Sequence, residues 1–471
     1  MRDSRTDQLR RPARSRARSG RALLGTLCLV AGVLASSTAG AQAPRETQFL
    51  PPPVSDPMLS PPPAAPRQVK SWDEALTLLR AHSPDYVTSY ESVVRAEAQS
   101  RIALAAVLPT LTGQGSYLHE FFTLTIPFGG ANIVTPPPDV FSASASLQWS
   151  VLNPRALYAV GTARENVRAT GLSFEDRRRV IALTVVNAML STLAAARVAE
   201  LNRVGLRSAL ERLTLTQVRM QYGQGTPLDV DRAAQDVAAA RSQLISGDEA
   251  LRQAREALGA ALGSTTAMSA PGDLDLQDFD AAVARTCRLN DDIEHRPDIA
   301  AARLRADIAE RGVHDAELMF SPSLSVGSQA TASTVAVLAP LNTWSVGAVL
   351  TVPLYDGGVR YGALKDSHAA LEQARQALVA ARVGAIVSSA QAQRSVSVYE
   401  ASRDVAQQQR DLAARIDQRT REGYARGVGT SLDLVVSAQS LRQADINLVL
   451  LEVEVGEARA SAVLANAECV Y

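Results

Sequence analysis

The 471-residue chain contains few of the residues from which active sites and metal centres are built. Its three cysteines include no C-x-x-C spacing, which argues against zinc and thioredoxin-type chemistry. Its five histidines are scattered, without metal-ligand spacing such as H-E-x-x-H. The G-x-G pairs at 223–225 and 427–429 lack the later glycine and the preceding strand of a nucleotide site. No nucleophile constellation is present, so we expect neither an enzyme nor a cofactor.

The chain also lacks a one-sided charge and a long apolar run. Residues 1–43 hold eight of the 48 basic residues and two of the 48 acidic ones, which leaves 40 basic and 46 acidic residues, a net charge of −6. A nucleic-acid partner is therefore not expected, because such binding needs a basic stripe. The longest apolar run, 22–35, is shorter than a transmembrane helix, which needs about 20 residues.

That apolar run belongs to a predicted secretory signal peptide at 1–43. An arginine-rich lead ending at Arg21 precedes it, and an A-x-A cleavage site closes it at residue 43. Export leaves Cys287 and Cys469, which could form a disulfide in an oxidising periplasm. Two separate small buried residues are an equally good interpretation. We therefore expect an exported chain whose cysteine pairing is open.

After the signal peptide, proline dominates residues 44–70, which predicts an extended linker without a core. Ordered structure is predicted from Ser71, because Ser71 and Glu74 have the spacing of a capping box. From there the chain repeats once, at a spacing of roughly 200 residues. Each half reads as helix, strand, strand, very long helix and helix, and the T-P-L-D of 226–229 recurs as T-S-L-D at 430–433. This pattern indicates a duplicated unit.

Two runs, 141–152 and 343–354, alternate apolar and polar residues. Such alternation indicates strands with one apolar face, and their length suits tilted membrane β-strands. Partner strands are predicted at about 109–126 and 322–335. The edge of a soluble sandwich is the alternative. However, four strands cannot close a barrel and lipid does not tolerate an open sheet edge, so strands from several subunits must join.

Between the first two strands, residues 127–139 are predicted to form an extracellular loop. Aromatic residues near the strands could form a girdle at the membrane interface or could simply pack in the ordinary way: Tyr117, Phe121, Phe122, Trp149 and Trp344.

The helical segments follow three-four apolar spacing, with alanine and glycine at alternate seam positions. This spacing indicates helices packed side by side at close range. Helices are predicted at 72–105, 156–222, 228–262, 297–319, 357–424 and 430–466. The two longest would each measure about 100 Å, and shorter helices stacked end to end match them in length. One chain cannot bury both faces of such a layer, so association is implied.

In this order the features resemble the outer membrane efflux protein (TolC) family. The marks are the R-P-D-I of 296–299, the V-P-L-Y-D-G-G of 352–358 and the glycine-containing turns before Leu228-Asp229 and Leu432-Asp433. The resemblance covers nearly all of the chain after the proline-rich lead. It implies a mainly α fold with a small β part. Three copies would build a long periplasmic α-helical barrel and, with four strands each, a twelve-stranded transmembrane β-barrel.

The same resemblance implies the function and its setting. It predicts the outer-membrane channel subunit of a tripartite efflux or type I secretion system, a passive homotrimeric duct with most of its mass in the periplasm. Its partners would be outer-membrane lipid, a periplasmic adaptor (membrane fusion) protein and an inner-membrane pump. The predicted division of the chain is signal peptide 1–43, linker 44–70, first repeat 71–268, equatorial linker 269–294 and second repeat 295–471.

The two helical hairpin tips have a direct physical interpretation. Gly225 is predicted to end its helix in a left-handed conformation, Thr226 to cap the next helix and Asp229 to sit three residues later. In the second repeat the scheme recurs with Gly427 or Gly429, then Thr430 and Asp433. We expect Gly225, Thr226, Gly427 and Thr430 to lie at the tips that dock an adaptor.

Asp433 alone can be interpreted as a first-turn carboxylate that complements the helix dipole. The resemblance implies that it is the first of two gate aspartates, with Tyr424 and Asp229 in the locking contact. Three such carboxylates around a threefold axis would repel one another and attract cations. The sequence departs from the family at the second gate position, which is Val436, and at the family arginine, which is Gly429.

Two other classes of protein compete with the channel. A periplasmic adaptor should offer one helical hairpin between compact β-domains, whereas this chain duplicates a strand-helix unit and has four alternating strands. A soluble exported enzyme would need a polar catalytic site, which the sequence does not offer.

Overall fold

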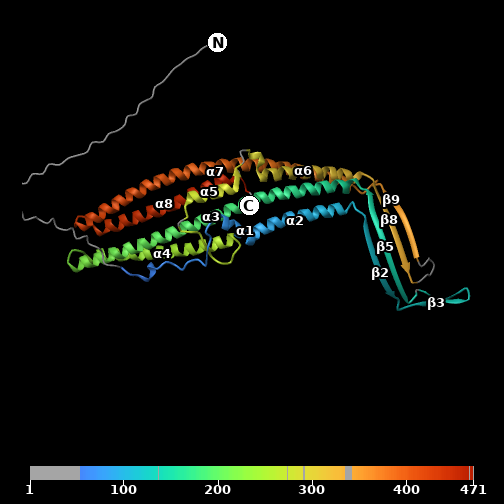
Figure 1. The fold of residues 1–471 in the computed structure, drawn as a ribbon, viewed down its shortest axis with the longest axis horizontal. Coiled ribbons are helices and arrows are strands. Elements are labelled where there is room, and N and C mark those ends of the chain that lie inside the picture. The colour runs from blue at the N-terminus through green and yellow to red at the C-terminus, as the bar shows by residue number, and fades with distance from the viewer. Residues whose placement is uncertain are drawn as a thin grey trace, which may run out of the picture. The chain divides into compact units, whose positions relative to one another are not determined.

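The computed structural model describes residues 54–135, 137–272, 274–289, 292–334, 342–465 and 467–469. The predicted signal peptide 1–43 and the first part of the linker, 44–53, lie outside the described residues. Within them the fold is mainly helical with a small β part, which confirms the predicted fold class (Figure 1).

The helices form two sets, one in each repeat. The first set is α1 Trp72–His82, α2 Pro84–Ala105, α3 Pro154–Gln221 and α4 Pro227–Ala261. The second set is α6 Pro297–Glu317, α7 Val359–Ala425 and α8 Ser431–Ala465, and α5 Leu276–Thr286 lies between the two sets.

The predicted helix 72–105 is broken into α1 and α2 at Ser83. The backbone of Ser83 is extended, and its side chain accepts a hydrogen bond from the backbone N–H of Tyr86. Pro84 then occupies the first position of α2, where its missing N–H costs nothing. A serine followed by proline therefore ends one helix and starts the next.

The two longest helices, α3 and α7, have 68 and 67 residues, so each measures about 100 Å. Helix α3 packs on α2, α4, α6 and α8, and α7 packs on α6 and α8 (Figure 1). The predicted seam of α4 is buried at most of its positions, among them Ala233, Val237, Ala240, Leu244, Gly247, Leu251 and Leu258. Gly247 on this seam leaves room for a side chain of α3: a Cβ there would lie 2.6 Å from the amide nitrogen of Asn202.

One apolar core joins the two repeats. Leu79 from α1, Met189 from α3, Phe279 from α5 and Leu464 from α8 are all buried in it. The Trp72 indole packs edge-on to Phe279 at 5.9 Å and donates to the Thr286 hydroxyl at 3.0 Å. The region between the repeats is therefore part of the core and holds α1, α3 and α8 together.

The main sheet has the strand order β2-β5-β8-β9, with each neighbouring pair antiparallel. The strands are β2 Thr110–His119, β5 Asp139–Leu152, β8 Ser323–Ser333 and β9 Asn342–Thr351, close to the predicted runs. Every residue of β2 and β9 is exposed in the single chain. The two edge strands are therefore exposed along their whole length in the single chain.

A second hairpin departs from the prediction. The first strand ends at His119 instead of continuing to 126. A separate strand, β3 Leu124–Phe128, begins inside the predicted strand and pairs with β4 Ala131–Thr135, which lies in the segment predicted as a loop at 127–139. Gly129 and Gly130 connect these strands with φ of 63° and 89°. Two left-handed residues form the two-residue turn that matches strand twist, and glycine adopts them without strain. The prediction missed this turn signal.

The proline-rich segment also differs from the prediction. Residues 57–59 form a short 3-10 helix, η1 Pro57–Leu59, and β1 Arg67–Gln68 pairs in parallel with β6 Met268–Ser269. Val69, directly after β1, is fully buried in the core. Proline prevents a helix here, but an extended segment can still pair with an edge strand and bury a valine. Described residues 54–70 are therefore packed against the fold instead of forming a coreless linker.

Candidate docking and gating site at the hairpin tips

The α3–α4 and α7–α8 hairpins turn in the same way. Gly223 follows α3 with φ of 72° and Gly427 follows α7 with φ of 78°. The Gly223 N–H donates to the Met220 carbonyl at 3.0 Å, and Gly427 donates to Tyr424 at 3.1 Å. The left-handed residue of the first tip is thus Gly223, not Gly225 as predicted, because α3 ends two residues earlier than that placement requires.

The second glycine of each tip has a different role. A Cβ on Gly225 would lie 3.2 Å from the backbone nitrogen of Met220, and one on Gly429 would lie 3.2 Å from that of Tyr424. Both contacts are tighter than ordinary packing allows, so a side chain would push the two helices of the hairpin apart. The G-x-G-T pattern therefore combines a left-handed turn with a close approach.

Threonine and aspartate cap the returning helices. The Asp229 carboxylate accepts from the Thr226 backbone N–H at 3.1 Å, and the Thr226 hydroxyl accepts from the Asp229 N–H at 3.3 Å. Thr430 and Asp433 make the same pair of bonds at 3.2 and 3.1 Å. Reciprocal capping satisfies backbone donors that a helix start leaves free. A hydrogen bond from Thr430 holds the pKa of Asp433 below its ordinary value, so the group is a carboxylate at neutral pH.

Two contacts join one tip to the other. The buried Ser431 hydroxyl donates to the Asp229 carboxylate, and this bond is the largest cause of the lowered pKa of Asp229. Arg219, in the last turn of α3, donates to the Tyr424 carbonyl at 2.8 Å and places its guanidinium 4.1 Å from the centroid of the Tyr424 ring. Tyr424 is only 6% exposed. The tips therefore meet through one stacked cation and one hydroxyl–carboxylate bond.

The structure thus brings two of the three predicted gate residues to the contact between the hairpins. Tyr424 and Asp229 lie there, each with its own partner, whereas the Asp433 carboxylate bonds to Thr430 of its own helix start. Sequence reasoning missed Arg219. The only available signal was a basic residue in the last turn of a helix, which many helices share.

A buried polar seam continues the contact between hairpins above the tips. Asp236 of α4 has a fully buried side chain, and Arg212 of α3 donates to it at 2.5 Å. The Gln439 amide of α8 donates to the other carboxylate oxygen at 3.0 Å. An ion pair that is buried and hydrogen-bonded on both sides fixes the register of the helices more than it adds stability. Three helices are therefore held in one alignment near the tips.

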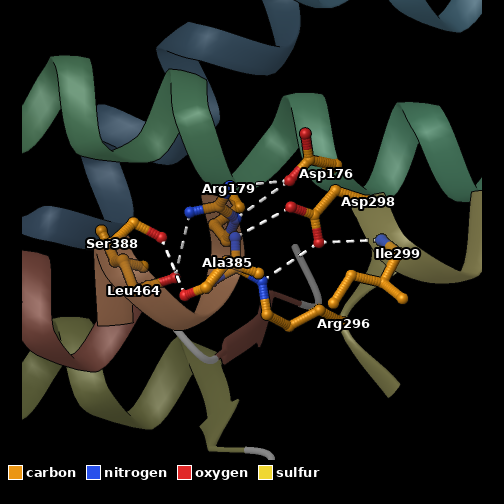
Figure 2. Close-up of polar contacts among 8 residues, drawn as sticks. All are labelled: Asp176, Arg179, Arg296, Asp298, Ile299, Ala385, Ser388 and Leu464. Atoms are coloured by element: carbon orange, nitrogen blue, oxygen red, sulfur yellow. Dashed lines mark hydrogen bonds and ion pairs between the residues drawn. The ribbon is translucent and has the colours of Figure 1, made fainter. Parts of the chain in front are cut away.

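The motifs that carried the family resemblance have structural roles. Arg296 is buried and clamps Asp298 with two bonds of 3.1 and 2.8 Å, and Asp298 also accepts from the Ile299 N–H at 2.9 Å. Figure 2 shows this pair beside Arg179, which bonds to Asp176 at 2.7 Å and reaches the Leu464 carbonyl at 3.4 Å. The R-P-D-I motif therefore anchors the start of α6 where the two repeats meet.

The V-P-L-Y-D-G-G motif builds the turn from the sheet into α7. The Asp356 carboxylate accepts from the N–H groups of Gly358 and Arg360 at 3.1 and 3.2 Å and from the Arg360 guanidinium at 2.7 Å. Arg360 also donates to the Pro353 carbonyl at 3.0 Å. Gly357 and Gly358 have φ of 71° and 94°. These bonds fix the direction in which β9 leads into the long helix.

The two cysteines of the exported chain lie on paired strands. Strand β7 Cys287–Leu289 pairs antiparallel with β10 Ala467–Cys469, in a register that sets Cys469 opposite Cys287. Cys287 is disulfide-bonded. Among the described residues, no group of three or more His, Cys, Asp or Glu side chains gathers as a metal site would.

The fold and the tips define a class: a chain of long paired helices that carries a small open sheet. Its sequence places it more closely. Residues 75–264 and 289–465 match the outer membrane efflux protein family, which is most of the chain. The chain therefore belongs to this family of outer-membrane export channels, which is not a family of enzymes, as the sequence motifs predicted.

Relatives and solved structures agree with this assignment. The chain is 24% identical over 392 residues to the pyoverdine export outer membrane protein OpmQ of Pseudomonas putida, covering 79% of this chain and 80% of that one. It is 24% identical to the fusaric acid resistance protein FusA of Burkholderia cepacia, over 62% of this chain and 56% of FusA. The match thus spans little more than half of FusA.

Among solved structures, the outer membrane protein VceC of Vibrio cholerae superposes with a TM-score of 0.67 at 20% identity, covering 84% of this chain and 96% of VceC. CusC superposes with a TM-score of 0.72 at 18% identity, covering 88% of this chain and 99% of CusC. One described helix, α3, has a stretch long and apolar enough to cross a membrane by composition, and half of that stretch is buried within the fold.

Proposed function

We propose that three copies of this chain build one passive duct through the outer membrane, docked at its helix tips to a periplasmic adaptor and an inner-membrane pump. The observation that carries the proposal is the four-stranded sheet. Its edge strands β2 and β9 have neighbours on one side only, and all of their residues are exposed. Lipid does not tolerate unpaired backbone groups, so the edges need partners from other copies.

The strand directions fit such a closure. Because each neighbouring pair is antiparallel, β2 and β9 run in opposite directions. The β9 edge of one copy can then pair antiparallel with the β2 edge of the next, and the pairing repeats without a break around a ring. Three copies give twelve strands, a number that bacterial outer-membrane barrels adopt.

Exposed apolar side chains support a lipid-facing sheet. Trp344 is 77% exposed, Leu111 is 74% exposed and Val346 is 63% exposed in the single chain. In a monomer in water these apolar side chains would stay exposed to solvent, whereas a barrel places them against hydrocarbon. Phe121 and Phe122, beyond the end of β2, are exposed as well and suit a membrane interface.

At the other end of the duct, we assign the tips to gating and docking. Gly225, Thr226, Gly427 and Thr430 shape two compact turns that an adaptor can contact. Asp433, one per copy, would ring the constriction, while Tyr424 and Asp229 hold the two hairpins of each copy together. The relatives are named for pyoverdine export, fusaric acid resistance and alkaline protease secretion. We assign this duct to export without choosing among such cargoes.

Purification from outer membranes in detergent tests the proposal. We expect a trimer with threefold symmetry and a central pore in particle images, and ion conductance in planar bilayers. In cells, chemical crosslinking followed by mass spectrometry should join the tip residues to one periplasmic adaptor. A folded, water-soluble monomer that ignores lipid vesicles would refute the duct, and a conducting trimer without any adaptor crosslink would refute the docking.

A further inference from the structure

Residues 54–66, called the strap below, lie along the α3–α4 hairpin. Asp56 caps η1 by accepting from the Met58 N–H at 2.9 Å. The side chains of Met58 and Leu59 then pack on an apolar platform. Its members are Leu206 and Ala209 of α3 and Val237, Ala240 and Leu244 of α4; Leu210 and Leu213 of α3 pack against this cluster as Met58 and Leu59 do. The strap therefore adds two apolar side chains to the cluster between α3 and α4.

Two arginines of α4 hold the strap in place. The Asp56 carboxylate lies 2.7 Å from the Arg241 guanidinium, and its side chain is only 7% exposed. The bond from Arg241 is the largest cause of the lowered pKa of Asp56, so the pair stays charged at neutral pH. Arg255 donates to the carbonyl of Pro63, which lies seven residues after Asp56, at 2.9 Å. The strap is thus fixed at two points, one ionic and one through its backbone.

The strap continues directly into the core of the molecule. Beyond residue 66 the chain forms β1, and the Val69 N–H donates to the Ser269 carbonyl at 2.9 Å. This connection tethers the strap beside its groove. A tethered segment competes with free partners at an effective concentration in the millimolar range, even where its own contacts are few.

The second hairpin lacks the leucines that α3 contributes, although its tip repeats the first at an offset of 204 residues. At that offset Leu206, Leu210 and Leu213 correspond to Arg410, Ala414 and Asp417. Arg410 pairs with Asp445 of α8 at 2.9 Å, and Asp417 accepts from the Ser437 hydroxyl at 3.1 Å. The three leucines of α3 are therefore specific to the first hairpin, whereas α8 keeps Leu441, Ala444 and Leu448 at the positions of Val237, Ala240 and Leu244.

We propose that the strap is a built-in competitor for the α3–α4 groove. The groove has an apolar floor with Arg241 and Arg255 at its rim, which is the chemistry that would accept an acidic amphipathic helix of a partner. With the strap in place, such a helix is excluded there and docks laterally along α7–α8 instead. This inference rests on the proposed docking of a periplasmic adaptor, but the position of the strap does not.

Cysteine accessibility tests the position of the strap. Leu210→Cys replaces a half-buried leucine that packs against the same cluster as Met58 and Leu59, and Ala414→Cys is the matched control at the same place in the second hairpin. Adducts of a water-soluble maleimide with each introduced cysteine are measured by peptide mass on the purified full-length protein. In the double variant Met58→Ser and Leu59→Ser we expect labelling at position 210 to become about tenfold faster, with position 414 unchanged. Equal labelling of position 210 with and without the Met58→Ser and Leu59→Ser changes would refute the proposed position of the strap.

The charge pair gives an independent check of the same contact. Asp56→Arg should speed labelling at position 210, and adding Arg241→Asp should restore slow labelling because the pair is re-formed with reversed signs. Ser60→Ala, on the exposed side of the strap, should change nothing. Asp56→Asn keeps a side-chain oxygen for the Met58 cap of η1 and removes only the charge. Slow labelling of position 210 in Asp56→Asn would show that the ion pair does not hold the strap.

Photocrosslinking in cells tests the competition. A photoreactive residue replaces Ile245, one turn from Arg241 on the same face of α4, or Val449, its counterpart in α8. With the adaptor identified by tip crosslinking, we expect adducts from position 449 in the intact protein, and from position 245 only after Met58→Ser and Leu59→Ser. Equal adducts from position 245 with the strap intact would refute the competition, whereas loss of every adaptor adduct would refute the proposed docking instead.

Discussion

The Arg219 guanidinium lies 4.1 Å from the centroid of the Tyr424 ring, and the same group donates to the Tyr424 carbonyl at 2.8 Å. The two residues are 205 positions apart and join the last turn of α3 to the last turn of α7. A planar guanidinium can stack on a ring and donate to a backbone oxygen at once, which an ammonium group cannot match. This contact links the moving parts of the proposed gate.

Arg219→Ala should loosen the tips. The stacked and hydrogen-bonded contact is worth about 1–2 kcal/mol, so we expect open events of the duct to become about tenfold more frequent. Single-channel recording in planar bilayers measures this. Arg415→Ala, an exposed arginine higher on α7, is the control and should behave like the unchanged protein. Wild-type opening in Arg219→Ala would show that the contact does not restrain the gate.

Asp433→Asn separates the charge of this residue from its capping role. The amide keeps a side-chain oxygen for the helix start but removes the carboxylate that would ring the threefold axis. We expect a lower preference for cations, measured as a smaller reversal potential in a salt gradient. Asp231→Asn removes an exposed carboxylate of α4 that is not among the predicted gate residues and should leave selectivity intact. If both variants alter selectivity equally, Asp433 has no special position.

The cysteine pair is expected to stabilise the junction of the two repeats. We propose that Cys287 bonds to Cys469, its partner in the strand register. Cys469→Ser should then cost about 2–4 kcal/mol and lower the melting temperature in detergent. Cys287→Ser should lower the free energy of unfolding by the same amount, and the double variant should lower it no further. Recovery of both cysteines as free thiols from the denatured, unreduced protein would contradict the pairing.

Asp280 of α5 should make stability depend on pH. Its side chain is 18% exposed, and its nearest cation is Arg459, at 3.8 Å. Burial raises the pKa of Asp280 from 3.8 to about 6, because lost hydration outweighs that attraction. The folded pKa lies above the unfolded one, so the group destabilises the fold fully above about pH 6 and not at all below about pH 4.

Asp280→Asn is therefore expected to raise the melting temperature at about pH 8, with a gain that shrinks to nothing as the pH falls through this window. Circular dichroism of the detergent-purified protein measures the melting temperature at each pH. The exposed Asp278 of the same helix provides the control, and Asp278→Asn should give the same pH profile as the unchanged protein. A gain for Asp280→Asn that does not vary with pH would point to packing instead of ionisation.

The sequence by itself determined the duplicated plan of the molecule. Period-two alternation at 141–152 and three-four spacing in α4 are local signals, because each residue reports its own face of a strand or helix. The caps at Thr226 and Thr430 are local too, since the bonds span three residues. For this reason the long helices, the existence of the four main strands and the order of the motifs could be predicted, whereas α5, in the segment predicted as a linker, and the break between α1 and α2 were missed.

Tertiary structure decided what depends on partners distant in the sequence. No local pattern shows that Arg219 would stack on Tyr424, that Asp56 would pair with Arg241 or that Val69 would enter the core. A proline-rich composition excludes a helix, but it does not say whether an extended segment meets water or an apolar groove. The groove exists only after α3 and α4 have packed, so the place of the strap follows from the assembled hairpin.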